Sequence, residues 1–193
     1  MKKFIQLLLV LSACAARGQG TLVYDQQVSN TNPPGGYNNI VPGPSGQSFI
    51  PSLSSVEFVQ LYLADTTYNG TGAIIYVSLW SGSLTNGTLL GSTAPILLPY
   101  GFVGLTNFVF SAPLTVAPGT SYYLQPAIQS GDNFAVGIVP GSLYAKGMAY
   151  FNGAASSGTD LWFREGIIVP EPSIALLAVL GGAGFYYSHR KKQ

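Results

Sequence analysis

Glycine and proline recur so often between residues 21 and 169 that no ten-residue stretch there keeps the apolar spacing typical of a helix. The segments between them are short runs rich in β-branched and aromatic residues, such as 56–63 and 73–80, and this composition favours strands. About nine such runs follow one another, which predicts an all-β fold. We expect an antiparallel β-sandwich, with a jelly-roll-like arrangement as its favoured variant.

Turn-forming residues mark where these runs are joined. Asn69-Gly70 and Asn86-Gly87 are typical of tight β-hairpins, because asparagine and glycine tolerate the positive φ that such turns need. Pro126 lies inside a strand-like run and predicts an edge strand or a bulge, since proline has no N–H to donate. Residues 30–48 show no periodic pattern and are expected to form a long loop.

The distribution of charge excludes one class of partner. Only 8% of the residues are charged, and most of the basic ones lie near the two ends of the chain. Residues 21–169 hold two bases, Lys146 and Arg164, against six acids, so this part of the chain has a net charge of −4. Nucleic-acid binding needs a basic surface, and we therefore expect no nucleic-acid partner.

Residues 1–20 have the composition of a secretory signal peptide. A basic start precedes an apolar stretch over 4–11, and small residues follow it, as in a signal helix that signal peptidase removes. Leu11–Cys14 also resembles a bacterial lipobox, so lipidation of Cys14 stays an alternative. Because Cys14 is the single cysteine, residues 21–169 hold no internal disulfide and must be stabilised by core burial.

The C-terminal segment, 170–193, has three parts in order: the motif Pro170-Glu171-Pro172, an apolar segment over 173–187, and a basic end over 188–193 with Arg190, Lys191 and Lys192. The apolar segment predicts a transmembrane helix. Its length of about 22 Å is shorter than a hydrocarbon core of about 30 Å. We therefore expect a marginal anchor that suits a transient stay in the membrane.

This tail resembles the PEP-CTERM sorting domain of exported proteins of Gram-negative bacteria, a tail also described as the C-terminal domain of ice-binding proteins. The resemblance implies that an exosortase, a membrane cysteine peptidase-transferase, processes the chain near the motif. By the same resemblance Pro170, Glu171 and Pro172 are recognition residues. It also implies an inner-membrane stage before processing and then the cell envelope, the cell surface or the extracellular space. An ordinary C-terminal membrane anchor is the alternative.

The part of the chain before the tail looks like the β-sandwich modules often carried ahead of such tails. The similarity lies in four segments, 47–49, 53–56, 112–124 and 160–164, and it supports the fold more than an activity. We expect three parts: a signal peptide over 1–20, a β-sandwich domain over 21–169, and the sorting tail over 170–193.

The predicted sandwich lacks the side chains of most hydrolytic machinery. The one histidine, His189, lies in the basic end, so residues 21–169 contain neither imidazole nor thiol. This excludes Ser-His-Asp and Cys-His catalysis there, and any metal site built on His or Cys. Paired carboxylates are still available, but no acid lies in a motif that resembles a catalytic one; the acids considered are Glu57, Asp132, Asp160 and Glu165. We expect no enzyme; the alternative is a small secreted polysaccharide hydrolase that uses paired carboxylates.

Two short loops could hold calcium. Gly131–Asn133 and Gly158–Asp160 place oxygen ligands beside glycines, which suits a structural calcium ion. Asp and Asn are also common turn formers, which is the favoured explanation of both loops. No other cofactor is expected.

Aromatic side chains are the remaining resource for binding. Their faces stack against sugar rings, and Trp80, Trp162 and Tyr37 are the candidates for contact with extracellular polysaccharide. Trp162 stands between Leu161 and Phe163, so a place in the core is favoured for it. Taken together, the sequence predicts an exported, non-catalytic envelope or extracellular-matrix protein, sorted by an exosortase and able to bind glycans.

Overall fold

The structure, a computed structural model, describes residues 20–29, 34–41, 43–67, 70–141 and 144–171. The chain divides into two compact units. One consists of residues 1–22 and 168–193, of which residues 20–22 and 168–171 are described. The other, Val23–Ile167, contains the surfaces discussed below.

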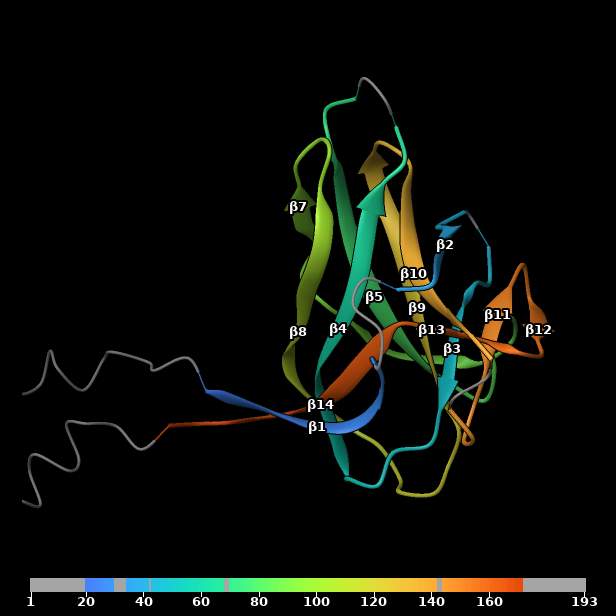
Figure 1. The fold of residues 1–193 in the computed structure, drawn as a ribbon. Helices are drawn as coiled ribbons and strands as arrows, with labels where there is room; N and C mark the ends of the chain where they lie inside the picture. The colour runs from blue at the N-terminus through green and yellow to red at the C-terminus, as the bar shows by residue number, and fades with distance from the viewer. Residues whose placement is uncertain (1–19, 30–33, 42, 68–69, 142–143, 172–193) are drawn as a thin grey trace, which may run out of the picture. The chain divides into compact units, whose positions relative to one another are not determined.

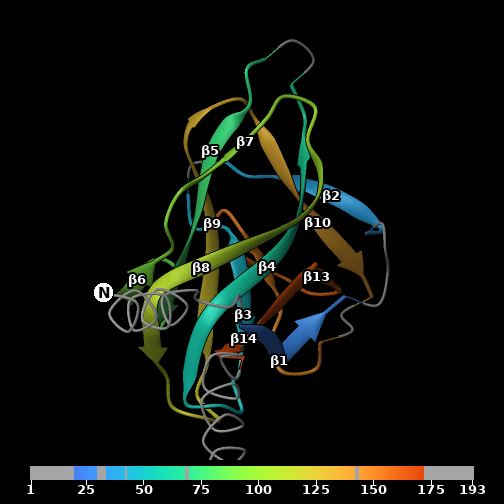
Figure 2. The same ribbon diagram turned by 90° about the vertical axis from the view of Figure 1, so that its left-hand side faces the viewer.

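The described residues form strands throughout, arranged as two antiparallel seven-stranded sheets (Figure 1, Figure 2). Sheet A consists of β1 (Thr21–Val28), β2 (Gly36–Asn39), β4 (Ser55–Asp65), β8 (Val103–Thr115), β10 (Phe134–Pro140), β13 (Thr159–Leu161) and β14 (Phe163–Val169). Sheet B consists of β3 (Gly46–Phe49), β5 (Ala73–Ser81), β6 (Thr88–Ser92), β7 (Ile96–Leu98), β9 (Tyr122–Gly131), β11 (Ala149–Phe151) and β12 (Ala154–Ser156). The predicted antiparallel β-sandwich is confirmed.

The alternating side chains of β4 show how the core is built. Val59, Leu61 and Leu63 are fully buried and belong to the apolar core. Successive strand residues point to opposite faces, so Gln60 and Tyr62 lie on the outer face of sheet A. β8 runs beside β4 along almost its whole length, as both views show (Figure 1, Figure 2).

In sheet B, β5 follows the same rule and creates a second outer face. Ile75, Val77 and Leu79 are fully buried in the core. Tyr76 and Trp80 alternate with them and are half-buried, so they lie on the outer face of sheet B. β9 pairs with β5 along its whole length and adds its own outward side chains to this face.

β4 and β10 pair over only three residues each, and the last two strands of sheet A pair with them beyond that point. β13 pairs with β10, whereas β14 pairs with β4. Trp162 joins the two strands, and its backbone N–H donates to the carbonyl oxygen of Gly137 at 2.7 Å. Its side chain is 1% exposed, with 6.1 Å between its ring centroid and that of Tyr62.

Two predictions about connections are wrong. Residues 30–48 are not one loop, because β2 and β3 lie within them and pair with β10 and β9. Asn69-Gly70 does not close a hairpin, since β4 and β5 on either side of it belong to different sheets. The pairings of β2 with β10 and of β3 with β9 have no local signal in the sequence, because each joins strands that are far apart along the chain.

Two other predictions agree with the structure. Asn86-Gly87 lies between β5 and β6, which pair antiparallel as a hairpin should. Pro126 lies in the part of β9 beyond Leu124, where the pairing with β3 has ended and β5 is the partner strand. An edge position of this kind does not need the missing N–H of proline.

Several predictions fall on residues outside the described part of the chain. These are the signal helix, Cys14, the apolar segment over 173–187, and the tail residues Pro172, Arg190, Lys191 and Lys192. Among the described residues, the structure contains no helix with the length and apolar character needed to cross a membrane.

Candidate functional site

The outer face of sheet B carries a groove of about 520 Å³. Trp80 and Tyr76 come from β5, and the register of the strands places Gln125 of β9 beside them. Leu89 of β6 pairs with Trp80 and lines the same groove. We call this the Trp80 groove. Its volume lies within the range of about 300–1,000 Å³ that is usual for small-molecule sites.

The walls of the Trp80 groove come from two loops. Residues 40–41 and Gly43, which follow β2, form one wall. The end of β9 at Gly131 and the loop residues Asp132 and Asn133 form the other. The side-chain N–H of Gln125 donates to the carbonyl oxygen of Gly43 at 3.0 Å, which ties the first wall to the floor. The indole Nε1 of Trp80 is buried and has no hydrogen-bond partner among the described residues.

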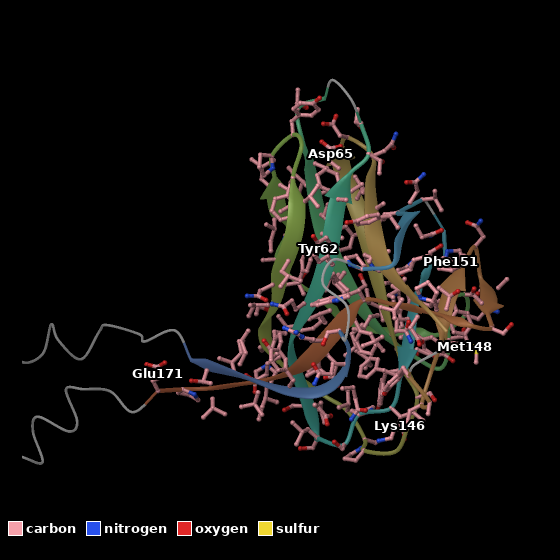
Figure 3. All side chains as sticks on the ribbon, viewed as in Figure 1. Tyr62, Asp65, Lys146, Met148, Phe151 and Glu171 are labelled. Carbon is pink, nitrogen blue, oxygen red and sulfur yellow. The ribbon has the colours of Figure 1, made fainter. Side chains whose placement is uncertain are left out.

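A second, smaller groove of about 260 Å³ lies beside the same segment of chain. Tyr37 of β2 and Phe151 at the end of β11 supply its aromatic rings. Figure 3 labels Phe151 on the side of the molecule where β2, β11 and β12 lie. We call it the Tyr37 groove. Val41 lines both grooves and is 39% exposed, so it forms the border between them.

The two grooves carry little charge. Asp132 is the one side chain among their lining residues that is charged in its ordinary state. Its carboxylate accepts the backbone N–H of Gly72, which links the loop between β4 and β5 to the loop before β10. Burial, and then the neighbouring Tyr62, raise the pKa of Tyr37, so this hydroxyl stays protonated at neutral pH. Apart from Asp132, the lining therefore consists of aromatic and aliphatic side chains and uncharged polar groups.

The structure brings together two of the three aromatic residues predicted to touch glycans. Trp80 and Tyr37 lie in adjoining grooves, although they are far apart in the sequence. Trp162 is buried, and the guanidinium carbon of Arg164 lies 4.9 Å from its ring. This position agrees with the core role favoured for Trp162.

Sequence reasoning missed Tyr76, Gln125 and Phe151. For Tyr76 a signal was present, because it alternates with Trp80 in the run 73–80 and must share its face. Gln125 and Phe151 had no such signal, since their places depend on which strands pair.

The acids considered for catalysis or calcium have separate contacts in the structure. Asp160 is fully buried, and its two oxygens accept the side-chain N–H of Gln47 and the backbone N–H of Tyr144, both at 3.0 Å. Asp132 accepts a backbone N–H as described, and Glu57 is half-buried on β4. Among the described residues, no three His, Cys, Asp or Glu side chains come together to hold a metal ion. The two predicted calcium loops thus have a structural explanation for their carboxylates.

Glu165 is a buried acid whose pKa is raised. It is fully buried; Oε1 accepts the backbone N–H of Gln26 at 3.1 Å, and Oε2 has no partner among the described residues. Burial, and then the charge of Asp25, raise the pKa of Glu165 to about 8. Burial also opposes ionisation of Asp25, but hydrogen bonds from Ser52 and Leu53 outweigh it and lower the pKa of Asp25.

A raised and a lowered carboxyl pKa side by side is an arrangement that acid–base catalysis uses. A substrate must reach such groups, however, and Glu165 is 0% exposed. Its geometry fits a structural acid whose carboxyl group links β14 to β1 through the hydrogen bond from Gln26 N.

The described residues of the Pro-Glu-Pro motif, for which a sorting role is predicted, follow the end of β14. Pro170 and Glu171 follow Val169 directly, and both are exposed (Figure 3). An exposed, proline-flanked segment is accessible to a processing enzyme.

Comparison with known proteins adds no assignment. No protein-family model matches the chain, and no curated protein matches its sequence.

Proposed function

We propose that this chain is an exported, non-catalytic envelope or extracellular-matrix protein that binds glycans through two adjoining grooves, the Trp80 groove on sheet B and the Tyr37 groove beside β2 of sheet A. The observation that carries the proposal is the pair of adjoining grooves, which combine Trp80, Tyr76 and Tyr37 with uncharged amides. Aromatic faces cover the apolar faces of sugar rings, and amides bind the hydroxyl groups around them. Such a site needs no charge, in keeping with its lining.

The sorting part of the proposal rests on the order of segments along the chain. A signal-peptide pattern precedes the sandwich, and the Pro-Glu-Pro motif follows it, with Pro170 and Glu171 exposed after the last strand. Signal peptidase acts at the first end and an exosortase at the second. The inner membrane holds the precursor transiently through residues 173–187, and the processed protein then belongs to the envelope, the cell surface or the extracellular matrix.

The finer fold assignment is a jelly roll. Its support is the path of the chain, which passes from one sheet to the other at each step from β8 to β11. Two Greek keys distributed over two sheets give a path of this kind.

A second candidate function is a small secreted polysaccharide hydrolase. One observation favours it: the raised pKa of Glu165 beside the lowered pKa of Asp25. Burial of Glu165 and the full use of both Asp160 oxygens support the non-catalytic function instead.

Binding is tested with the exported protein and neutral oligosaccharides in isothermal titration calorimetry. Trp80→Ala should weaken binding about tenfold or more, since aromatic anchors dominate such sites. Tyr100→Ala is the matched control, because Tyr100 is an exposed tyrosine outside the lining of both grooves. Equal affinity of the Trp80 variant and the wild type would contradict the proposal. Release of reducing sugar that disappears in Glu165→Gln would favour the hydrolase.

Sorting is tested separately by the mass of the protein in envelope fractions. Glu171→Ala should retain the tail that the wild type loses. An intact tail in the wild type, or equal processing of both chains, would exclude an exosortase substrate.

A further inference from the structure

We infer that the Trp80 groove and the Tyr37 groove are two subsites of one site, which takes an extended, uncharged polysaccharide chain of several sugar units. The inference rests on the proposed function and adds the length and the charge class of the ligand.

The first support is continuity between the grooves. Val41 lines both of them and is 39% exposed, so one ligand can pass over it from one groove into the other. The remaining border is the same stretch of chain: Ile40 faces the first groove, and Asn39 faces the second.

The second support is size. The Trp80 groove, at about 520 Å³, is large enough for a small molecule by itself. The Tyr37 groove, at about 260 Å³, is below the usual range of about 300–1,000 Å³. As the extension of a larger site, the Tyr37 groove would hold the next sugar units of a chain that is already bound at Trp80.

The third support is rigidity. Three hydrogen bonds hold the border segment: Gln125 Nε2 donates to Gly43 O at 3.0 Å, Asn152 N donates to Ser45 Oγ at 3.0 Å, and Gly153 N donates to Pro44 O at 2.7 Å. The first lies at the Trp80 groove, and the other two lie at the Tyr37 groove. These bonds fix Gly43, Pro44 and Ser45 before a ligand arrives, and a fixed wall lowers the entropy cost of binding.

The fourth support is charge. No Lys or Arg lines either groove in the described part of the chain, whereas Asp132 lines the first. An acidic polysaccharide would meet a carboxylate and no cation there, and like charges in a binding site are unfavourable. Neutral sugars meet rings and amides; the second groove alone offers Asn38, Asn39 and Asn152.

The experiment measures how affinity depends on chain length. Neutral oligosaccharides of two and of six sugar units, from β-glucan, mannan and galactan, are titrated into the exported protein, with a six-unit galacturonan as the acidic comparison. We expect at least one neutral six-unit chain to bind about tenfold tighter than its two-unit form. Tyr37→Ala should abolish this gain, so that both chain lengths bind the variant with similar affinity, while Trp80→Ala should weaken the binding of both lengths.

Each other outcome is decisive. Equal affinity for both lengths, with no effect of Tyr37→Ala, would overturn the two-subsite inference and leave the proposed glycan binding intact. Tighter binding of galacturonan than of every neutral chain would overturn the charge class. No binding of any oligosaccharide would overturn the proposed function itself. Asn39→Ala, an exposed change in the same groove, gives the same test if Tyr37→Ala fails to fold.

Discussion

Asp160 of β13 and Glu165 of β14 are both fully buried in sheet A, but they differ in how many hydrogen bonds their carboxyl oxygens accept. Both oxygens of Asp160 accept hydrogen bonds, from Gln47 and Tyr144. Glu165 has one oxygen bonded to Gln26 N and one without a partner among the described residues, and its pKa is raised to about 8. Two fully buried acids of one sheet therefore differ in how many N–H donors they meet.

The largest effect is expected for Asp160→Asn, which breaks the satisfied member of the pair. Both neighbours of Asp160 are N–H donors, so the new NH₂ group must face one of them. A buried polar clash of this kind should lower the free energy of unfolding by about 3–5 kcal/mol. Urea unfolding measures it. A loss below about 1 kcal/mol would show that donors do not hold Asp160 in place.

The next effect is the pH dependence caused by Glu165. Between the ordinary value of 4.5 and about 8, the folded protein keeps the proton on Glu165 while the unfolded chain has lost it. Stability is thus highest at low pH for this group and falls as pH rises toward about 8, by at most about 1.4 kcal/mol per pH unit. Glu165→Gln, which mimics the protonated acid, should remove this fall. Melting temperatures of both chains between pH 5 and pH 9 test it, and parallel profiles would contradict the raised pKa.

Asp25→Asn should have a smaller, combined effect. It removes the negative charge that raises the pKa of Glu165, so the Glu165 titration should move below pH 8 by less than about one unit. It also weakens the acceptor for the N–H groups of Ser52 and Leu53, at a cost of about 1–2 kcal/mol. The Glu165 carboxyl signal in ¹³C NMR reports the first effect. An unchanged midpoint would show that burial alone sets this pKa.

Tyr144→Phe should have the smallest effect. The Tyr144 hydroxyl donates to Gln26 Oε1 at 3.0 Å and accepts Ile50 N at 3.1 Å. Its removal should cost about 1 kcal/mol in urea unfolding, since the ring contact with Phe163 remains. A loss as large as that of Asp160→Asn would mean that the two acids belong to one network rather than to two separate environments.

The sequence alone predicted the sandwich because apolar alternation is local. The run 73–80 contains both the buried Ile75 and Val77 and the outward Trp80, so its face could be read directly. β3 could not be predicted in this way. Its Gln47 is buried because Asp160 accepts its N–H and Leu161 N donates to it, and neither partner is near in the sequence.

The candidate site was predictable to a similar degree. Trp80 and Tyr37 were identified as aromatic residues suited to sugars, but their meeting at Val41 depends on β2 lying beside β10 and on the wall that follows it. The raised pKa of Glu165 depends on burial and then on Asp25 of β1, which is far away in the sequence although β1 and β14 are neighbouring strands. Such long-range pairings have no trace in local composition.

The hydrogen bond from Gln26 to Glu165 joins residues 139 positions apart, and β1 and β14 are neighbours in sheet A. A chain exported with its N-terminus first delivers β1 to the outside at the start and β14 at the end. On the proposed export route, β1 therefore lacks its neighbour until nearly the whole domain has crossed the membrane. Pairings between distant segments form slowly, which keeps a chain threadable during translocation. We expect folding of this domain to finish only when the residues just before the Pro-Glu-Pro motif emerge. Pairing of β14 with β1 would then complete the fold at the end of export.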